Sequence, residues 1–143
     1  MLERLALYSD GGARGNPGPA AIAFLAVSET GQVIHTDSRF IGETTNNQAE
    51  YNALLAALEF AKFIKAQEVT CHLDSELVGK QLKGEYAVKN ANLQKLWCEA
   101  SILKSCFKKV CYVNVPRSNP YISRADALVN KTLDAEARKR PLA

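Results

Sequence analysis

The sequence predicts an α/β domain built on one mixed sheet with helices packed on its faces. Three strands with short connections come first, over residues 4–10, 20–27 and 33–41, and predict an antiparallel meander. After residue 46 the hydrophobic spacing changes to a helical period, and helices then alternate with two more strands. This order within 143 residues fits a single domain, which we expect to cover residues 1–143.

Local patterns justify each element in turn. Leu5 and Leu7 alternate with Ala6 and Tyr8 in the first strand, and the second, AAIAFLAV, is apolar throughout, as in a strand buried on both faces. The remaining predicted elements are a helix over 47–65, a strand over 68–74, a short helix capped by Ser75 and ending at Gly84, a helix starting at Asn90 or Asn92, a strand over 109–115, and a helix from Ser123 to Lys139.

The composition is that of a globular domain without membrane spans. Hydrophobic residues make up 47% and charged residues 23% of the chain, and no apolar run approaches the ~20 residues of a membrane-spanning helix. The first ten residues lack the apolar centre of a signal peptide. Four cysteines without a C-x-x-C pair, and only two histidines, disfavour zinc and are typical of a reducing compartment. We therefore expect a cytoplasmic protein with no membrane contact.

The net charge of +3 is unevenly distributed along the chain. Residues 101–143 carry nine Lys and Arg against three Asp and Glu, whereas residues 1–100 carry nine against twelve. A basic C-terminal third is typical of a surface near a polyanion, and a solvated charged helix has the same composition. The residues alone leave both interpretations open.

Three acidic residues stand where a sheet protein rarely places a solvated charge. Asp10 ends the first predicted strand before a glycine pair, and Asp74 ends the fourth. Active sites of open α/β sheets form beyond the carboxyl ends of strands, so two adjacent parallel strands would bring both carboxylates together. Glu50 falls on the packed side of its helix, where a carboxylate is costly unless a cation compensates it. As alternatives, the aspartates are turn or cap residues, and Glu50 merely favours the helix dipole.

Asp126 allows two interpretations. Ser123-Arg-Ala-Asp126 fits an S-x-x-[DE] capping box, in which Asp126 helps to start a helix. With Asp10, Glu50 and Asp74 it completes four carboxylates with few histidines and no paired thiols, which favours Mg²⁺, with Mn²⁺ as a substitute, over zinc. Two such ions about 4 Å apart can activate water and stabilise the leaving oxygen in phosphodiester cleavage. The sequence therefore predicts a divalent-metal site that accepts a polyanion.

Four motifs spread over nearly the whole chain resemble those of type 1 ribonuclease H. They are DGGARGNPGPA from Asp10, TTNNQAEYNALLAAL from Thr44, LDSELV around Asp74 and RADALVN around Asp126. The resemblance implies the ribonuclease H-like fold, a five-stranded mixed sheet with an antiparallel meander, then parallel strands, and helices on both faces. It also implies a monomeric endonuclease that cleaves the RNA strand of RNA–DNA hybrids, leaving 5′-phosphate and 3′-hydroxyl ends. Double-stranded RNA stays open as a second substrate.

Matched by position, Asp10, Glu50, Asp74 and Asp126 correspond to the catalytic, metal-binding carboxylates of that family. The candidate substrate-binding residues are Gly11, Gly12, Asn46, Asn47 and Gln48 in the minor groove, and Lys89 and Asn90 on phosphates. Glycine lets a backbone approach nucleic acid, and Asn and Gln both donate and accept, as a 2′-hydroxyl requires. The alternatives are that the glycines form a plain hairpin turn and that Asn46 or Asn47 caps the long helix.

The chain departs from the family pattern before Asp126. Many members carry a histidine in that loop, and VPRSNPYISRAD has none. His35 and His72 fall in predicted strands and are interpreted as structural. Residues 83–90 are too short for the basic protrusion that some members insert. The rival functions are a DNA-processing nuclease, disfavoured by the Gly-Gly and Asn-Asn motifs, and a catalytically silent hybrid-binding module, disfavoured by the four acids.

Overall fold

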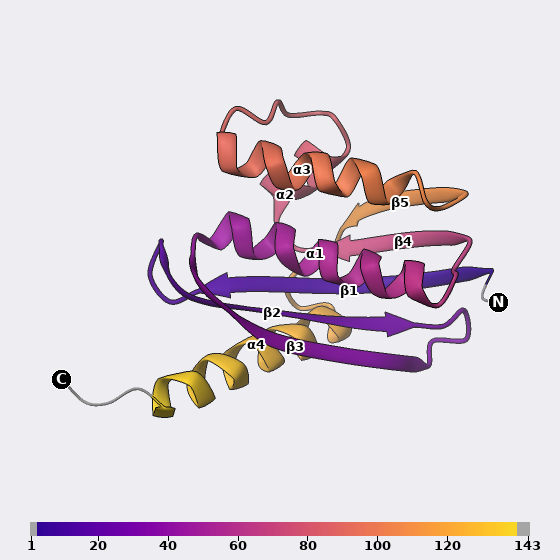
Figure 1. Ribbon diagram of the computed structural model, residues 1–143. Coiled ribbons are helices and arrows are strands. Elements are labelled where there is room, and N and C mark those ends of the chain that lie inside the picture. Colours follow the sequence, from indigo (N-terminus) through magenta and orange to yellow (C-terminus); the bar gives the residue numbers. More distant parts are fainter. Residues whose placement is uncertain (1–2, 140–143) are drawn as a thin grey trace.

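One mixed sheet of five strands organises the protein (Figure 1). The computed structural model describes residues 3–139. The elements are β1 (Arg4–Ala13), β2 (Gly18–Val27), β3 (Val33–Thr44), α1 (Asn46–Phe63), β4 (Glu68–Leu73), α2 (Glu76–Leu82), α3 (Ala91–Lys104), β5 (Lys109–Asn114) and α4 (Pro120–Lys139). The strand order is β3-β2-β1-β4-β5, and β1, β2 and β3 pair antiparallel, whereas β4 pairs in parallel with β1 and β5. The predicted meander and the parallel strands that follow it are confirmed.

Helices cover both faces of the sheet, and each face has its own core (Figure 1). α1 and α3 pack on the face that presents Leu7, Phe24 and Cys71. α4 packs on the opposite face, against side chains of β2 such as Ala23. β2 is therefore buried on both sides over Ala20–Val27, as predicted. None of the helices within residues 3–139 has the length and apolar character needed to cross a membrane.

β1 is longer than predicted, and this changes the position of Asp10. The strand continues through the glycine pair because its antiparallel ladder with β2 extends as far as Ala13 opposite Ala20. Its parallel pairing with β4 ends earlier, at Tyr8 opposite His72. Asp10 therefore lies inside a strand rather than at its end, but beyond the last pair with β4. It still stands at the carboxyl edge of the parallel pair.

The start of α1 corrects the prediction that Asn46 or Asn47 caps this helix. Thr45 is the N-cap: its side chain accepts a hydrogen bond from Gln48 N at 3.2 Å, and Gln48 Oε1 accepts one from Thr45 N at 3.3 Å. This reciprocal capping box gives a partner to two backbone N–H groups, those of Thr45 and Gln48. The N–H of Gln48 is one of the four at the start of a helix that have no partner within the helix. Both asparagines therefore lie inside the first turn. α2 and α3 begin at predicted caps.

α4 begins at Pro120, three residues earlier than predicted. Proline is favoured at the first position of a helix, where an amide would have no partner. The Asn119 side chain accepts hydrogen bonds from the amides of the two residues after Pro120, at 3.0 and 3.2 Å, and so caps the helix. Ser123 instead donates to Arg117 O at 3.1 Å. The predicted capping box of Ser123 and Asp126 is therefore wrong, because both residues lie inside the helix.

Both histidines have structural partners within the sheet layers. His72 Nδ1 lies 3.1 Å from Leu7 O, and its ring stacks on Tyr8 with centroids 4.2 Å apart. His35 stacks on Phe60 of α1 at the same centroid distance. Neither histidine lines the cavity described below, so their interpretation as structural residues holds.

Candidate metal centre

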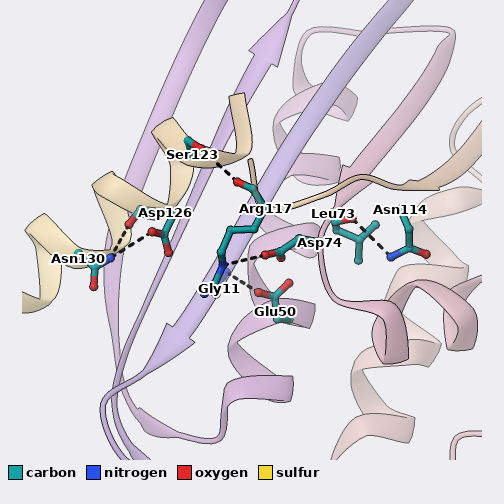
Figure 2. Close-up of polar contacts among 9 residues, drawn as sticks. All are labelled: Gly11, Glu50, Leu73, Asp74, Asn114, Arg117, Ser123, Asp126 and Asn130. Carbon is teal, nitrogen blue, oxygen red and sulfur yellow. Dashed lines mark hydrogen bonds and ion pairs between the residues drawn. The ribbon is translucent and has the colours of Figure 1, made fainter. Parts of the chain in front are cut away.

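The carboxyl edges of β1 and β4 place two aspartates side by side. Tyr8 lies opposite His72 in the parallel pair, and Asp10 and Asp74 follow these residues by two positions along the chain, Asp74 just past the end of β4. Glu50 approaches them from the start of α1, which packs across β1. One carboxylate oxygen from each of the three acids lies within 4.8 Å of the other two. The structure thus brings together three of the four candidate ligands, and Figure 2 shows two of them, Glu50 and Asp74.

The close approach of α1 to β1 depends on Gly11. Its backbone N–H donates to Glu50 Oε1 at 3.2 Å, and a Cβ atom at this position would lie 2.2 Å from the Ala49 carbonyl oxygen. Only glycine leaves room for a neighbouring backbone at this distance. Gly12 is under no such constraint, because its Cβ would meet Val129 Cγ1 at 3.7 Å, an ordinary contact. The first glycine therefore serves the packing that delivers Glu50.

We expect Gly11→Ala to push the start of α1 away from β1 and to lower the free energy of unfolding, whereas Gly12→Ala leaves it nearly unchanged. Overpacking of this kind costs about 1–3 kcal/mol. Thermal unfolding of the two variants without metal, followed by circular dichroism, checks the difference. Equal melting temperatures for the two variants would contradict the packing argument.

Two of the three acids are buried and carry raised pKa values. Asp10 is 3% exposed and Glu50 7%. Burial and then the charge of Asp74 raise the pKa of Asp10 to about 7, and burial followed by the charge of Asp10 raises that of Glu50 well above its ordinary value. Among the buried side-chain nitrogen and oxygen atoms of residues 3–139, only Glu50 Oε2 lacks a hydrogen-bond partner. A buried carboxylate oxygen without a donor, beside two other carboxylates, fits a divalent cation.

In the metal-free protein, these raised pKa values should make stability fall as the pH rises. Between about pH 4 and pH 7 the folded state keeps a proton on Asp10 that the unfolded chain has released, so the free energy of unfolding decreases across this window and levels off above it. One pKa unit corresponds to about 1.4 kcal/mol, which gives a decrease on the order of 4 kcal/mol. Urea unfolding at several pH values checks this against Asp10→Asn, whose decrease should be smaller, because of the two buried acids only Glu50 is then left to titrate. Parallel curves for the two proteins would show that Asp10 does not titrate in this window.

Asp126 lies at the rim of the cluster. It is half-buried on α4, and its Oδ2 accepts a hydrogen bond from Asn130 Nδ2 at 3.4 Å (Figure 2). Its charge adds to the rise in the pKa of Asp10, after the larger effects of burial and Asp74. Asp126 is not one of the three residues whose oxygens lie within 4.8 Å of one another. It lines the same cavity as they do.

Arg117 supplies a positive charge beside the cluster that the sequence pattern did not reveal. Its Nε donates to Asp74 Oδ2 at 3.4 Å, and the charges of Asp74 and then Asp126 raise its pKa. The Asp74 side chain is 13% exposed and that of Arg117 76%, so the arginine covers the carboxylate from the solvent side. Arg117 stands in the loop that connects β5 to the helix of Asp126, where a basic residue is ordinary and gives no signal in the sequence.

A cavity of about 550 Å³ opens over the cluster. The candidate substrate residues that line it are Gly11, Gly12, Asn46 and Asn47. Gln48 does not, because its side-chain oxygen is held in the capping box with Thr45. Lys89 and Asn90 are also absent from its lining: Lys89 is exposed on the loop before α3, and Asn90 caps that helix through Leu93 N.

Asn46 connects the glycine-rich strand end to α1. Its Oδ1 accepts a hydrogen bond from Ala13 N at 2.8 Å, and its backbone N–H donates to Asn16 Oδ1 at 2.9 Å. Its carboxamide oxygen is thereby occupied, and the amide group is left as a donor toward the cavity. The end of β1, which carries Gly11 and Gly12, and the helix that carries Glu50 are held together at this point.

Comparison with known proteins gives consistent matches. Residues 8–132 match the reverse transcriptase-like family. Ribonuclease HI of Halobacterium salinarum is 41% identical over 131 residues, 92% of this chain and 65% of that protein. Bifunctional protein Rv2228c of Mycobacterium tuberculosis is 39% identical over 137 residues, 94% of this chain and 37% of that protein. The crystal structure of LC11-RNase H1 in complex with an RNA/DNA hybrid has a TM-score of 0.88 at 39% identity, covering 93% of this chain and 99% of that one.

A mixed sheet with acids gathered at the carboxyl edge of its central parallel strands defines a ribonuclease H-like domain. The chain belongs to the ribonuclease H family. This confirms the resemblance drawn from the motifs and the fold that it implied. The chain spans about two thirds of the length of the halobacterial relative and just over a third of the mycobacterial one.

Proposed function

We propose that this chain hydrolyses the RNA strand of RNA–DNA hybrids with divalent metal ions, leaving 5′-phosphate and 3′-hydroxyl ends. The observation that carries the proposal is Glu50 Oε2, buried without a partner beside Asp10 and Asp74. The relatives support the substrate class: several are ribonucleases H, and LC11-RNase H1 forms a complex with an RNA/DNA hybrid.

Asp10, Glu50 and Asp74 would hold the metal, with Asp126 as the fourth carboxylate from α4. The donor set is all oxygen, which favours Mg²⁺, with Mn²⁺ as a substitute. When bound, such ions lower the pKa of water and offset the charge that develops on the leaving 3′-oxygen. The protein's own part is to hold the acids at one edge of the sheet: Gly11 N–H fixes one oxygen of Glu50, and the other is left for the cation.

The cavity walls beside the metal centre would receive the minor groove of the hybrid. Gly11 and Gly12 allow a sugar-phosphate backbone to come close, and Asn46 and Asn47 offer side-chain amides to 2′-hydroxyl groups. Gln48 would act indirectly, by holding the start of α1 through its capping box with the preceding loop. These contacts favour a hybrid over a DNA duplex and so distinguish the proposal from a DNA-processing nuclease.

Phosphates of the hybrid would be held by charged and polar residues around the cavity and beyond it. Arg117 stands at the cavity wall, where a guanidinium can pair with two phosphate oxygens. Lys89 and Asn90 lie outside the cavity and would contact phosphates further along the duplex. The basic C-terminal third, residues 101–143, offers further positive charges: Lys109 is exposed, and Arg140 lies outside the described residues.

We also propose that the chain acts as one ribonuclease H domain, as a monomer, in the cytoplasm.

A nicking assay on an end-labelled RNA–DNA hybrid tests the proposed function. We expect cuts in the RNA strand when Mg²⁺ or Mn²⁺ is present, none in EDTA, and an intact DNA strand throughout. Binding of the hybrid without any cut in either metal would leave a hybrid-binding module as the function. Cuts in the DNA strand would favour the DNA-processing nuclease.

For Asp126, the ligand interpretation predicts that Asp126→Asn lowers cleavage by orders of magnitude and changes stability little. The structure removes the capping role. The substitution alters the hydrogen bond with Asn130, which an amide oxygen can still accept, and it removes both a repulsion toward Asp10 and an attraction toward Arg117, two effects that oppose each other. Substitutions away from buried contacts usually change stability by about 0.5 kcal/mol or less. Cleavage rates and melting temperatures measured on the same preparation check both parts. Native cleavage rates in the variant would exclude Asp126 from the metal centre.

A further inference from the structure

Asn114, the last residue of β5, binds the chain on either side of Asp74. The β4–β5 ladder ends with Leu73 opposite Asn114, so Asp74 lies in the turn just beyond the sheet. Asn114 Nδ2 donates to Ser75 O at 2.8 Å and to Leu73 O at 3.5 Å, and Figure 2 shows the second of these bonds. One side-chain amide therefore contacts the carbonyls of both neighbours of Asp74.

Two residues of the α2 region fix the orientation of this carboxamide. Gly79 lies against it so closely that a Cβ atom at this position would be 2.3 Å from Asn114 Oδ1. Lys83, which caps the end of α2, places Nζ 3.4 Å from the same oxygen. Since an ammonium group only donates, it orients the oxygen toward itself and leaves the amide nitrogen for the two carbonyls.

The segment that follows Asn114 also reaches the Asp74 carboxylate. Arg117 donates to Asp74 Oδ2 at 3.4 Å, and its own carbonyl accepts a hydrogen bond from Ser123 on α4. Asp74 is thus held through its neighbouring carbonyls by Asn114 and through its carboxylate by Arg117. One short segment connects the strand end, the carboxylate and the helix that carries Asp126.

We propose that Asn114 is a positioning residue for Asp74 and therefore for the metal centre; this rests on the proposed function. Leu73 O also accepts from Val115 N, and Ser75 O from Gly79 N, each at 3.0 Å. The side-chain amide is thus a second donor to both carbonyls, and it ties the end of the strand to the start of α2 across Asp74. Without it the Asp74 backbone can shift away from Asp10 and Glu50. Removing an outer partner of a metal ligand typically costs roughly 10- to 100-fold in metal affinity or activity.

The test compares Asn114→Ala with Val110→Ala, a core substitution on the same strand that touches the α1 and α3 layer rather than Asp74. Both variants lose stability, the second because it leaves a cavity. At a temperature where both remain folded, Asn114→Ala should lose roughly 10- to 100-fold in kcat on an RNA–DNA hybrid, with KM within about twofold. Val110→Ala should keep the kcat of the wild type. If Asn114 only contributed to stability, the two variants would have the same kcat at a temperature where both are folded.

Calorimetric titration with Mn²⁺ gives a readout that does not depend on cleavage. Asn114→Ala should bind Mn²⁺ at least about tenfold more weakly than Val110→Ala. Gly79→Ala, which displaces the carboxamide from the α2 side, should reproduce the loss even where Asn114→Ala does not fold. Wild-type Mn²⁺ affinity and kcat in the Asn114 and Gly79 variants would overturn the proposal, as would a wild-type protein that binds no Mn²⁺. A wild-type protein that binds Mn²⁺ but cuts no hybrid would refute only the proposed function, and the titration would still decide the role of Asn114.

Discussion

Replacing Glu50 by glutamine should stop cleavage and at the same time raise the stability of the metal-free protein. Loss of the ligand charge should reduce hybrid cleavage at least about a thousandfold, equivalent to about 4 kcal/mol of transition-state stabilisation. Stability should rise because a buried carboxylate with an unpartnered oxygen becomes an amide, which can donate to Asp10 or Asp74 rather than repel them. Single-turnover cleavage with saturating metal and thermal unfolding in EDTA measure the two effects.

Glu59→Gln is the matched control, because Glu59 lies on the same helix with an exposed side chain outside the cavity. It should change neither cleavage nor melting temperature. Near-native cleavage by Glu50→Gln would remove Glu50 from the metal centre. A lower melting temperature than that of the wild type would contradict the argument from repulsion, even if cleavage were lost.

The second large effect concerns the sugar of the substrate. A pure DNA duplex offers no 2′-hydroxyl, so the donors that Asn46 and Asn47 present to the groove would lose their partners. Each unmet polar partner costs about 1–3 kcal/mol, and at about 1.4 kcal/mol per tenfold two or three together suppress cleavage by several orders of magnitude. We therefore expect cleavage of the RNA strand of a hybrid and no detectable cleavage of a DNA duplex of the same sequence.

Chemical substitution within one RNA strand makes this test sharper. Replacing four or five ribonucleotides around a mapped cut with 2′-deoxy versions should move or abolish that cut. The same replacement well away from the cut serves as the control and should leave it in place. Unchanged rates at the substituted site would refute recognition of the 2′-hydroxyl and favour the DNA-processing nuclease.

The order of elements was predictable because each change of hydrophobic period coincides with a change of packing surface. The helix starts were less so, since neighbouring polar residues compete for the same role. At α1 the competition between Thr45 and Asn46 is decided by Gln48, which completes a capping box only with the threonine. At α4, Asn119 before Pro120 forms a stronger start than the S-x-x-D pattern three residues later. These decisions depend on side-chain geometry that a residue pattern does not contain.

In the candidate site, too, some residues could be predicted from the sequence and others could not. Asp10, Glu50 and Asp74 could be selected from the sequence because each places an acid where its element packs against the sheet or ends beside another strand. Arg117 and Asn114 violate no local rule, since a basic or polar residue near a loop is ordinary. Their significance comes from contacts with the turn around Asp74, which lies 43 residues before Arg117 in the chain. Only the folded arrangement of β4 and β5 reveals them.

The helix that carries Asp126 is attached to a different core from the elements that carry the other three acids. Asp10, Glu50 and Asp74 stand on or beside β1, α1 and β4, which share the layer packed with α3, whereas α4 packs on the opposite face of the sheet, against β2 and the far side of β1. Parts of a protein with separate packing open independently, at a lower free energy than global unfolding requires. Detachment of α4 would leave three acids in register and remove Asp126, the proposed fourth ligand. We therefore expect an inactive form that is still largely folded, so that inactivation on warming should precede the loss of the sheet.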